Sequence, residues 1–372
     1  MTAQAGSARV PVSLVTGFLG SGKTTLIAAL LKQPAMDGTA VVVNEFGAVG
    51  IDDAIFAEAL DEDNVVLLAN GCLCCAPGDD LARTVWNLTR RRPKPPRRIV
   101  IETSGMADPA AALRRLMGDP RLRQAIRLDA LVATVDAVNG LKSLDEQPVA
   151  QRQCAVADRR LITKTDLAGP SASKALADRL LALNPGAPVA FVSHGEIDAD
   201  RLFGASLFNS GNGDANADRW LGIEGHRALP DGDADGSIRF SRGPAHDHAV
   251  GSWLIEEARP VDWDVLSPRL GDIVARHGDR LLRVKGIVRT VGDERPLVIH
   301  GVQRVFHAPV RLQRWTRAPA TSIVVIGDSG ARTAIELIAG ALGRAAVARS
   351  NEPEAGQGTR GPAWRTEGAG RA

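Results

Sequence analysis

The stretch at residues 17–24, Gly-Phe-Leu-Gly-Ser-Gly-Lys-Thr, constrains the fold more than any other part of the chain. It follows an apolar run at 12–16 and leads into an apolar, helix-forming segment at 25–31. A buried strand, a glycine-rich turn and a helix are the context in which the pattern G-x-x-x-x-G-K-[ST] binds phosphate. The stretch therefore predicts a nucleoside triphosphate site, and the alternative is a glycine turn that holds no ligand.

Two side chains of this stretch are expected to act on the triphosphate directly. Lys23 would reach the outer phosphates, and the hydroxyl group of Thr24 would bind magnesium. The glycines at 17, 20 and 22 would let backbone N–H groups point at phosphate oxygens, and the helix N-terminus would add the positive end of its dipole.

Length and composition indicate an ordinary globular protein with room for two domains. The chain has 372 residues, 44% of them hydrophobic and 24% charged, and a formal net charge of +2. This balance gives no general attraction to nucleic acid or to an acidic membrane. The basic segment 90–98 is rich in proline and lacks aromatic residues, which favours a solvated loop over a nucleic-acid surface. No apolar run is long enough to span a bilayer, and residues 1–9 lack the apolar core of a secretory signal, so we expect a cytoplasmic protein.

Two further strand ends predict the rest of the hydrolytic centre. The apolar strand at 99–101 ends in Glu102-Thr-Ser-Gly105. Glu102 is expected to hold a magnesium-bound water or to orient the attacking water, and Gly105 to let a backbone N–H approach the γ-phosphate. The β-branched run at 40–43 leads into a loop that contains Glu45. This is where switch residues approach magnesium in such nucleotidases, and the alternative is an exposed acidic turn.

Three cysteines within four residues, Cys72, Cys74 and Cys75, follow the predicted strand at 65–68. Three thiolates can hold zinc or a similar divalent ion and leave its fourth position open, which favours exchange over permanent binding. Cys154 stands apart from them in the sequence, so a structural site with four cysteines is not expected. Buried small side chains or a redox pair are the alternatives to a metal site.

A base-recognition motif is predicted at Thr163-Lys164-Thr165-Asp166, after the strands at 131–136 and 159–162. The carboxylate of Asp166 can accept both the ring N–H and the exocyclic amine of guanine, a pair that adenine does not offer. The stem of Lys164 would pack over the base or ribose. His194 follows the last strand of this half and would lie near the base pocket or serve as a structural loop residue.

The second half of the sequence predicts a smaller α+β domain. Strands are expected at 251–255, 281–288, 297–300, 303–307 and 323–326, with helices at 262–277 and 331–342. The glycine- and aspartate-rich stretch before this domain predicts a mobile linker. His246 and His248 form either an auxiliary metal site or a pair of solvated histidines.

Taken together, these motifs make the chain resemble the CobW-type GTPases, a subgroup of the phosphate-loop GTPase family that includes the urease and hydrogenase metal-insertion GTPases. The resemblance covers most of the chain, and the segments that carry it lie at 17–24, 44–47, 70–75, 102–105, 157–158, 282–286 and 301–303. It implies an α/β phosphate-loop NTPase domain with a mostly parallel sheet at 1–208 and a CobW-like C-terminal domain at 238–345. Composition predicts the linker at 209–237 between them and a disordered tail at 346–372.

The resemblance also implies a GTP-hydrolysing metallochaperone that uses GTP and Mg²⁺ and delivers Zn²⁺ or Co²⁺ to an acceptor protein, with a homodimer as one assembly. Cys72, Cys74 and Cys75 would bind the cargo ion, and Glu45 and Glu102 would be the acids near magnesium. The nucleotide-binding residues would be Gly17, Gly20, Ser21, Gly22, Lys23, Thr24, Thr25, Thr163, Lys164 and Asp166.

Thr163 stands where the family's guanine motif has Asn. We expect this replacement to remove a hydrogen bond to the guanine imidazole edge or to the phosphate loop, and so to weaken base affinity more than to change base identity. A phosphate-loop transferase with structural cysteines and a redox-regulated GTPase without cargo are the competing hypotheses.

Overall fold

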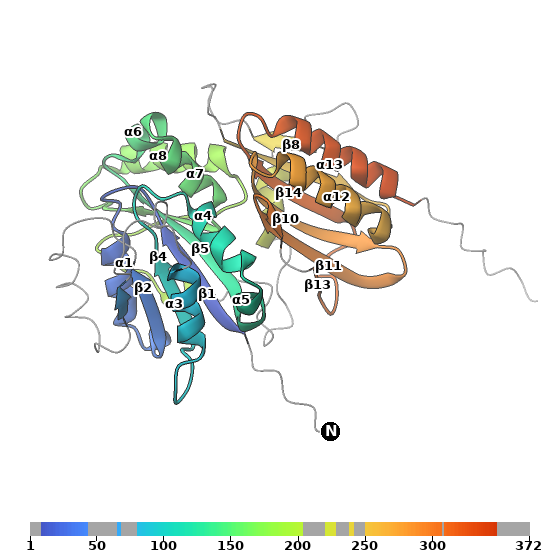
Figure 1. Cartoon of the computed structure of the whole chain (residues 1–372). Coiled ribbons are helices and arrows are strands. Elements are labelled where there is room, and N and C mark those ends of the chain that lie inside the picture. The colour runs from blue at the N-terminus through green and yellow to red at the C-terminus, as the bar shows by residue number, and fades with distance from the viewer. Residues whose placement is uncertain are drawn as a thin grey trace, which may run out of the picture.

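The structure is a computed structural model that describes residues 9–43, 65–67, 80–203, 220–227, 238–241, 250–306 and 309–347. These residues form two units that lie side by side, each a sheet with helices packed on it (Figure 1). The predicted site residues Glu45, Cys72, Cys74 and Cys75, and the predicted pair His246 and His248, lie outside the described residues.

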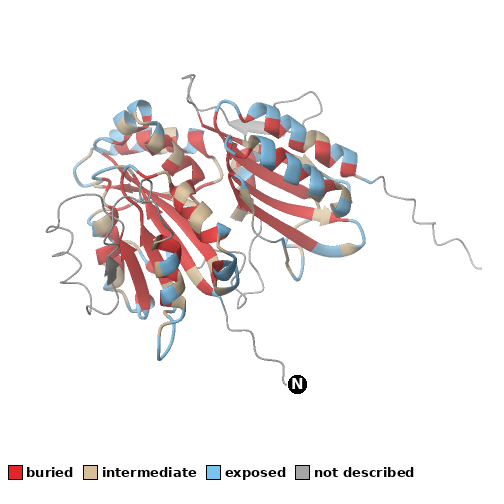
Figure 2. Ribbon diagram, in the orientation of Figure 1, coloured by how far each residue is buried: buried red, intermediate tan, exposed pale blue. Residues whose placement is uncertain are grey.

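In the described part of the first unit, seven parallel strands form one sheet in the order β3-β2-β4-β1-β5-β6-β7. The strands are β1 (Val10–Thr16), β2 (Thr39–Val43), β3 (Val65–Leu67), β4 (Arg98–Glu102), β5 (Ile126–Asp136), β6 (Arg159–Thr163) and β7 (Val189–Phe191). Their apolar, β-branched runs suit a sheet that is covered on both faces, and most strands of this sheet are drawn red, as buried, in Figure 2.

The helices that cover this sheet begin where the sequence supplies caps or proline. They are α1 (Lys23–Leu31), α3 (Asp80–Thr89), α4 (Pro109–Gly118), α5 (Pro120–Ala125), α6 (Gly140–Glu146), α7 (Pro148–Val156), α8 (Pro170–Leu183) and α9 (Ala199–Leu202), with a 3₁₀ turn η1 (Pro34–Met36). Asp108 caps α4 by accepting a hydrogen bond from the Ala110 N–H group, and Asp119 caps α5 in the same way. β1 lies between β4 and β5, so the carboxyl end of β1 is the switch point where ligands bind in sheets of this kind.

The second unit is an antiparallel sheet with two helices on one face. In the described residues it contains β8 (Ile238–Ser241), β9 (Gly251–Glu257), β10 (Leu281–Thr290), β11 (Asp293–Val302), β12 (Val305–Phe306), β13 (Val310–Arg311) and β14 (Thr321–Gly327). Neighbouring residues of these strands enter different cores. Ile255 and Ile323 pack toward α12 (Trp263–His277) and α13 (Arg332–Ala345), whereas Leu254 and Val324 pack toward Leu221. The predicted α/β phosphate-loop domain and the smaller second domain are confirmed.

Part of the predicted mobile linker is a packed element. Residues 220–227 are described and contain the short helix α11 (Ile223–Arg227), whose residue Ile223 is buried with Leu221 against the second sheet. Gly222 also lies so close to the first unit that an added Cβ would come within 2.2 Å of the Gly186 backbone. Within the predicted linker this segment is therefore a packed element, because its apolar side chains contact the second sheet and its Gly222 backbone lies against Gly186 of the first unit.

Candidate functional site

The glycine-rich loop at 17–22 joins the carboxyl end of β1 to the start of α1. Gly17, Gly20 and Gly22 have φ angles of 147°, 69° and 85°, a region that other residues rarely adopt. At Gly17 an added Cβ would lie 2.4 Å from the carbonyl oxygen of Thr134 in β5. The loop is therefore held close to the neighbouring strand, and only glycine fits at position 17.

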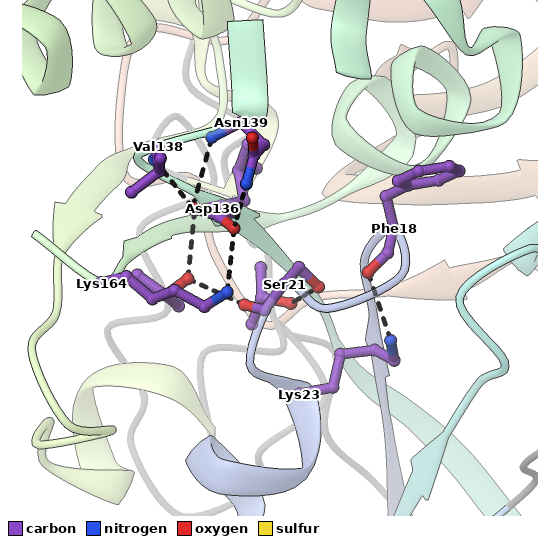
Figure 3. A network of polar contacts seen from close by, with 10 residues as sticks. Phe18, Ser21, Lys23, Asp136, Val138, Asn139 and Lys164 are labelled. Carbon is purple, nitrogen blue, oxygen red and sulfur yellow. Dashed lines mark hydrogen bonds and ion pairs between the residues drawn. The ribbon is translucent and has the colours of Figure 1, made fainter. Parts of the chain in front are cut away.

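Lys23, the first residue of α1, folds back over this loop (Figure 3). Its Nζ donates hydrogen bonds to the carbonyl oxygens of Gly17 at 3.1 Å and Phe18 at 3.4 Å, and the residue is buried. These carbonyl groups hold the ammonium group against the loop. From this position the ammonium group can bind phosphate oxygens in place of the carbonyl oxygens.

Thr24 and Glu102 meet at the ends of adjacent elements. The Thr24 hydroxyl donates a hydrogen bond of 2.9 Å to Oε1 of Glu102, the last residue of β4, and Glu102 is only 1% exposed. A hydroxyl and a carboxylate are the hard oxygen ligands that magnesium prefers. The two predicted magnesium-site residues that the structure describes are thus brought together, and their chemistry fits that ion.

The loop that follows Glu102 packs directly against the phosphate loop. The Thr103 N–H donates to the carbonyl oxygen of Val15, and the Thr103 hydroxyl lies 2.9 Å from that of Thr16. An added Cβ at Gly105 would fall 2.8 Å from the backbone nitrogen of Leu19. A displacement of residues 103–105 would therefore also displace the phosphate loop.

The base motif is tied to the phosphate loop by the side chain that departs from the family pattern. The Thr163 hydroxyl donates to the carbonyl oxygen of Ser21 at 2.8 Å, with the carbonyl oxygen of Val135 at 3.3 Å. The expectation that this replacement removes a hydrogen bond to the phosphate loop is wrong, because the threonine hydroxyl reaches the loop carbonyl group.

Lys164 is positioned by an aspartate from the neighbouring strand. Its φ angle of 56° is unusual for a residue with a side chain, and its Nζ lies 2.9 Å from Oδ2 of Asp136 at the end of β5 (Figure 3). Asp136 also accepts hydrogen bonds from the Val138 N–H at 2.7 Å and the Asn139 side chain at 3.2 Å. Partial burial acts to raise the pKa of Asp136, but the hydrogen bonds from Lys164, Val138 and Asn139 outweigh it and lower this pKa.

Asp166 lies at the more open side of the site. Its side chain is 31% exposed, and its Oδ2 is 3.9 Å from Nε2 of His194. The hydroxyl groups of Thr165 and Ser193 lie 2.7 Å apart, so the base motif and the loop after β7 are joined. Gly195, with a φ angle of 77°, packs against the Thr25 carbonyl group in α1. The loop after β7 thus contacts both the base motif and the start of α1, so these two segments lie close together.

A cavity of about 320 Å³ adjoins the phosphate loop. It lies between residues 18–21, the pair of Asp136 and Lys164, and helices α6 and α7. The predicted phosphate- and base-binding segments therefore border a hollow of the size in which small ligands bind.

The described residues contain no group of three or more His, Cys, Asp or Glu side chains placed to hold a metal ion. Cys154, in α7, is buried, and burial raises the pKa of its thiol to about 12 against the opposing effects of Arg160 and Arg179. Because thiolates rather than thiols bind metals, Cys154 is unsuited to that task.

None of the helices in the described ranges is both long and apolar enough to cross a bilayer.

Three side chains that organise this region were not among the predicted site residues: Thr134, Asp136 and Gln153. The Thr134 hydroxyl is 2.7 Å from that of Ser21, and the Gln153 amide donates to the carbonyl oxygens of Gly105 and Ala107. Asp136 had a visible signal, because it is an acid at the end of a predicted strand. Thr134 and Gln153 had none, because their partners lie 113 and 46 to 48 positions away.

A parallel sheet with a glycine-rich loop at its switch point, and a threonine–glutamate pair beside that loop, defines the class of phosphate-loop nucleoside triphosphatases. Residues 11–191 match the family described as CobW/HypB/UreG, nucleotide-binding domain, and residues 250–342 match the cobalamin synthesis protein CobW C-terminal domain. The chain belongs to the CobW/HypB/UreG family and has that family's two-domain CobW arrangement. The assignment to the CobW-type GTPases made from the sequence motifs is confirmed.

Curated relatives cover most of the chain. The zinc chaperone YjiA of Escherichia coli (strain K12) is 32% identical over 321 residues, which are 86% of this chain and 94% of that protein. The zinc chaperone CobW of Sinorhizobium sp is 29% identical over 329 residues, which are 81% of this chain and 87% of the relative. The crystal structure of the Zn(II)-bound YjiA GTPase from E. coli superposes with a TM-score of 0.63 at 26% identity, covering 91% of this chain and 99% of that one.

Proposed function

We propose that this protein is a GTP-hydrolysing zinc carrier in which Cys72, Cys74 and Cys75 bind the ion and the nucleotide state sets how tightly they hold it. The observation that supports this most is the hydrogen bond between Thr24 and Glu102, because it joins the phosphate-binding helix to β4, which pairs with β2, and β2 pairs with β3, the strand that precedes the cysteines in the sequence. The relatives named as zinc chaperones extend over both domains.

Each part of the nucleotide has candidate partners in this chain. The backbone N–H groups of loop 17–22 and the ammonium group of Lys23 bind the phosphates. Asp166 and Lys164 bind the guanine base, and Thr163 keeps that motif in register with the phosphate loop. Thr25 joins the nucleotide-binding residues, and Thr24, Glu45 and Glu102 would hold Mg²⁺, which neutralises charge on the β- and γ-phosphates when it is bound.

Hydrolysis is assigned to the end of β4. Glu102 orients the attacking water through its carboxylate, and the Gly105 N–H group donates to the γ-phosphate. When that phosphate leaves, the Gly105 backbone loses its partner, and the loop that packs on Leu19 relaxes.

The register of the sheet supports a route by which this change would reach the cargo ligands. Glu102 is in register with Val43 of β2, and Val43 is in register with Leu67 of β3. Cys72 follows Leu67 by five residues, which can span at most about 18 Å. The γ-phosphate loop therefore follows β4 and the cargo segment follows β3, with β2 between them and paired to both, so a shift of β4 can reach the cargo segment through β2.

Thiolate ligands suit Zn²⁺, and Co²⁺ is the second cargo that this ligand set accepts. The partner is a cytoplasmic acceptor protein that needs the metal, and a homodimer is the assembly to test. Because the fourth ligand position stays open, an acceptor ligand can enter it and take the ion.

Metal content tests the cargo site directly. The GTP-bound protein should carry about one zinc ion per chain, and the Cys72→Ser/Cys74→Ser/Cys75→Ser variant should carry none. Cys154→Ser is the matched control and should retain the ion, because that thiol is buried and protonated. Equal zinc content in wild type and the triple variant would show that these cysteines do not hold the cargo.

A further inference from the structure

We propose that Gln153 is a positioning residue for GTP hydrolysis, and that helix α7 connects the γ-phosphate loop to the second domain through it. The inference rests on the proposed hydrolytic role of residues 102–105. It assigns to α7 a task that none of the motifs in the sequence carries.

Gln153 uses both hydrogens of its amide group on one loop. The residue is fully buried, and its Nε2 donates to the carbonyl oxygens of Gly105 and of Ala107, each at 3.0 Å. On its other side the Gly105 backbone packs against Leu19 of the phosphate loop. Gly105 is therefore held between the phosphate loop and α7. The direction of its N–H group then depends on the position of the Gln153 side chain.

A second contact joins α7 to the end of the same loop. Nη1 of Arg152 lies 3.6 Å from Oδ2 of Asp108, the residue that caps α4. The loop at 103–108 is thus attached to α7 at Gly105, Ala107 and Asp108, and α4, which starts from this loop, contacts β11 and β12 of the second domain.

The C-terminal end of α7 is bound to the second domain by buried charged groups. Arg283 of β10 donates to the carbonyl oxygen of Val156, the last residue of α7, and its Nη2 lies 2.9 Å from Oδ2 of Asp158. Lys285 contacts the other oxygen of Asp158 at 2.5 Å. The side chain of Arg283 is 3% exposed, so these contacts lie inside the domain interface.

Apolar side chains also connect α7 to the second domain. Ala155 and Val156 of α7 belong to one core with Leu282 and Ile326 of the second sheet. Gln153 and Val156 are three residues apart on one helix, a rise of about 4.5 Å. A displacement of loop 103–108 therefore moves Gln153 and Val156 together, and the bonds to Arg283 pass that displacement to β10.

Steady-state hydrolysis tests the positioning role. Gln153→Met keeps the size of the side chain and removes both donated bonds. We expect kcat for GTP to fall about tenfold or more while KM changes less than about threefold, because the groups that bind base and phosphates are untouched. Gln151→Met is the matched control, since Gln151 lies on the same helix, is buried and donates instead to the Leu144 carbonyl group at 2.6 Å. Equal kcat values for the two variants would overturn the proposal.

Hydrogen exchange tests the connection to the second domain without any metal. In wild type, amides at 281–285 should exchange at least about threefold more slowly with a non-hydrolysable GTP analogue than with GDP. The difference should vanish in Gln153→Met and persist in Gln151→Met. Arg283→Lys keeps the charge beside Asp158 but loses the fork that also reaches Val156, so it should shrink the difference even if Gln153→Met folds poorly.

A wild type with no nucleotide-dependent exchange at 281–285, or an undiminished difference in Arg283→Lys, would contradict the relay. These assays contain no zinc, so their failure leaves zinc carriage standing. A wild type that does not hydrolyse GTP would instead remove the proposed function itself.

Discussion

At the scale of single residues, Thr163 joins the two halves of the proposed nucleotide site. Its hydroxyl reaches the Ser21 carbonyl group, and Ser21 in turn contacts Thr134 of β5. The base motif, the phosphate loop and the central sheet are thus linked through short hydroxyl side chains. A threonine at the asparagine position therefore preserves the bond inside the protein, and only the direct contact with the guanine imidazole edge is left to differ.

Removing this hydroxyl should weaken nucleotide binding. Thr163→Val keeps the shape of the side chain and leaves the Ser21 carbonyl group without its donor, at a cost of about 1 kcal/mol. We expect about fivefold weaker GTP binding in a fluorescence titration. Thr89→Val, which removes a similar bond of 2.7 Å to the Trp86 carbonyl group in α3, should bind GTP as wild type does. Unchanged affinity in Thr163→Val would show that the link does not contribute to binding.

The carboxylate of Glu102 should matter for hydrolysis far more than for binding. Glu102→Gln keeps the acceptor oxygen for Thr24 but removes the negative charge. We expect kcat to fall about 100-fold or more, the range for loss of a group that orients or activates the nucleophile. GTP binding measured by calorimetry should persist. Glu336→Gln, at an exposed position on α13, is the charge-matched control and should leave kcat unchanged. Normal turnover in Glu102→Gln would show that this carboxylate does not orient the attacking water.

At the scale of elements, the loop between β4 and α4 depends on a close approach of backbones. Gly105→Ala would place a methyl group 2.8 Å from the Leu19 nitrogen, so one of the two loops must shift. We expect kcat to fall about tenfold or more. Gly118→Ala in α4 is the control, because its added methyl group meets nothing within 4 Å, and it should hydrolyse GTP normally. If Gly105→Ala hydrolysed GTP as fast as Gly118→Ala, the close approach would have no catalytic role.

Most strands of the fold could be predicted from the sequence because apolar runs between turn residues are local signals. The predicted strand at 40–43 is observed as β2, and that at 281–288 extends by two residues to Thr290. The short strands β8 and β13 were missed, because two to four residues carry little periodicity and both depend on pairing with distant strands. Helix α11 was missed because the composition around it is that of a linker.

The parts of the candidate site that consist of consecutive residues in a local motif could be predicted from the sequence. The phosphate loop, Glu102 and the base motif are of this kind. Gln153, Arg283 and Lys285 are not, since a buried amide or cation shows its meaning only when its partner is known. Asp158 and Lys285 are separated by 127 positions, and no pattern within either segment points to the other.

At the scale of the whole molecule, the interface between the two domains includes one carboxylate, that of Asp158, bound between two cations. Asp158 accepts hydrogen bonds from Arg283, Lys285 and the Leu131 N–H group. Burial acts to raise the pKa of Asp158, but Arg283 and Lys285 outweigh it and hold this pKa well below its usual range. Removing one partner of a buried pair of this kind costs about 3 kcal/mol of stability.

Low pH should reduce the contribution of Asp158 to the stability of the folded chain. The pKa of Asp158 is lower in the folded than in the unfolded chain, so its stabilisation is complete above the unfolded value of about 4 and is lost as pH falls toward the folded value. In urea unfolding, wild type should exceed Asp158→Asn by about 3 kcal/mol at pH 6. That margin should shrink by about 1 kcal/mol between pH 4 and pH 3. Asp145→Asn, at an exposed ion pair with Arg179, should match wild type throughout. A margin that does not change below pH 4 would contradict this role.

The central claim is that the nucleotide state sets the affinity for zinc, and a chelator competition measures it directly. Zinc affinity is determined for the protein bound to a non-hydrolysable GTP analogue and for the protein bound to GDP. We predict affinity at least about tenfold higher with the GTP analogue, because the γ-phosphate loop follows β4, the cysteine segment follows β3, and β2 pairs with both strands. Equal affinities in the two states would contradict the account, since a ligand that does not discriminate between states cannot shift them.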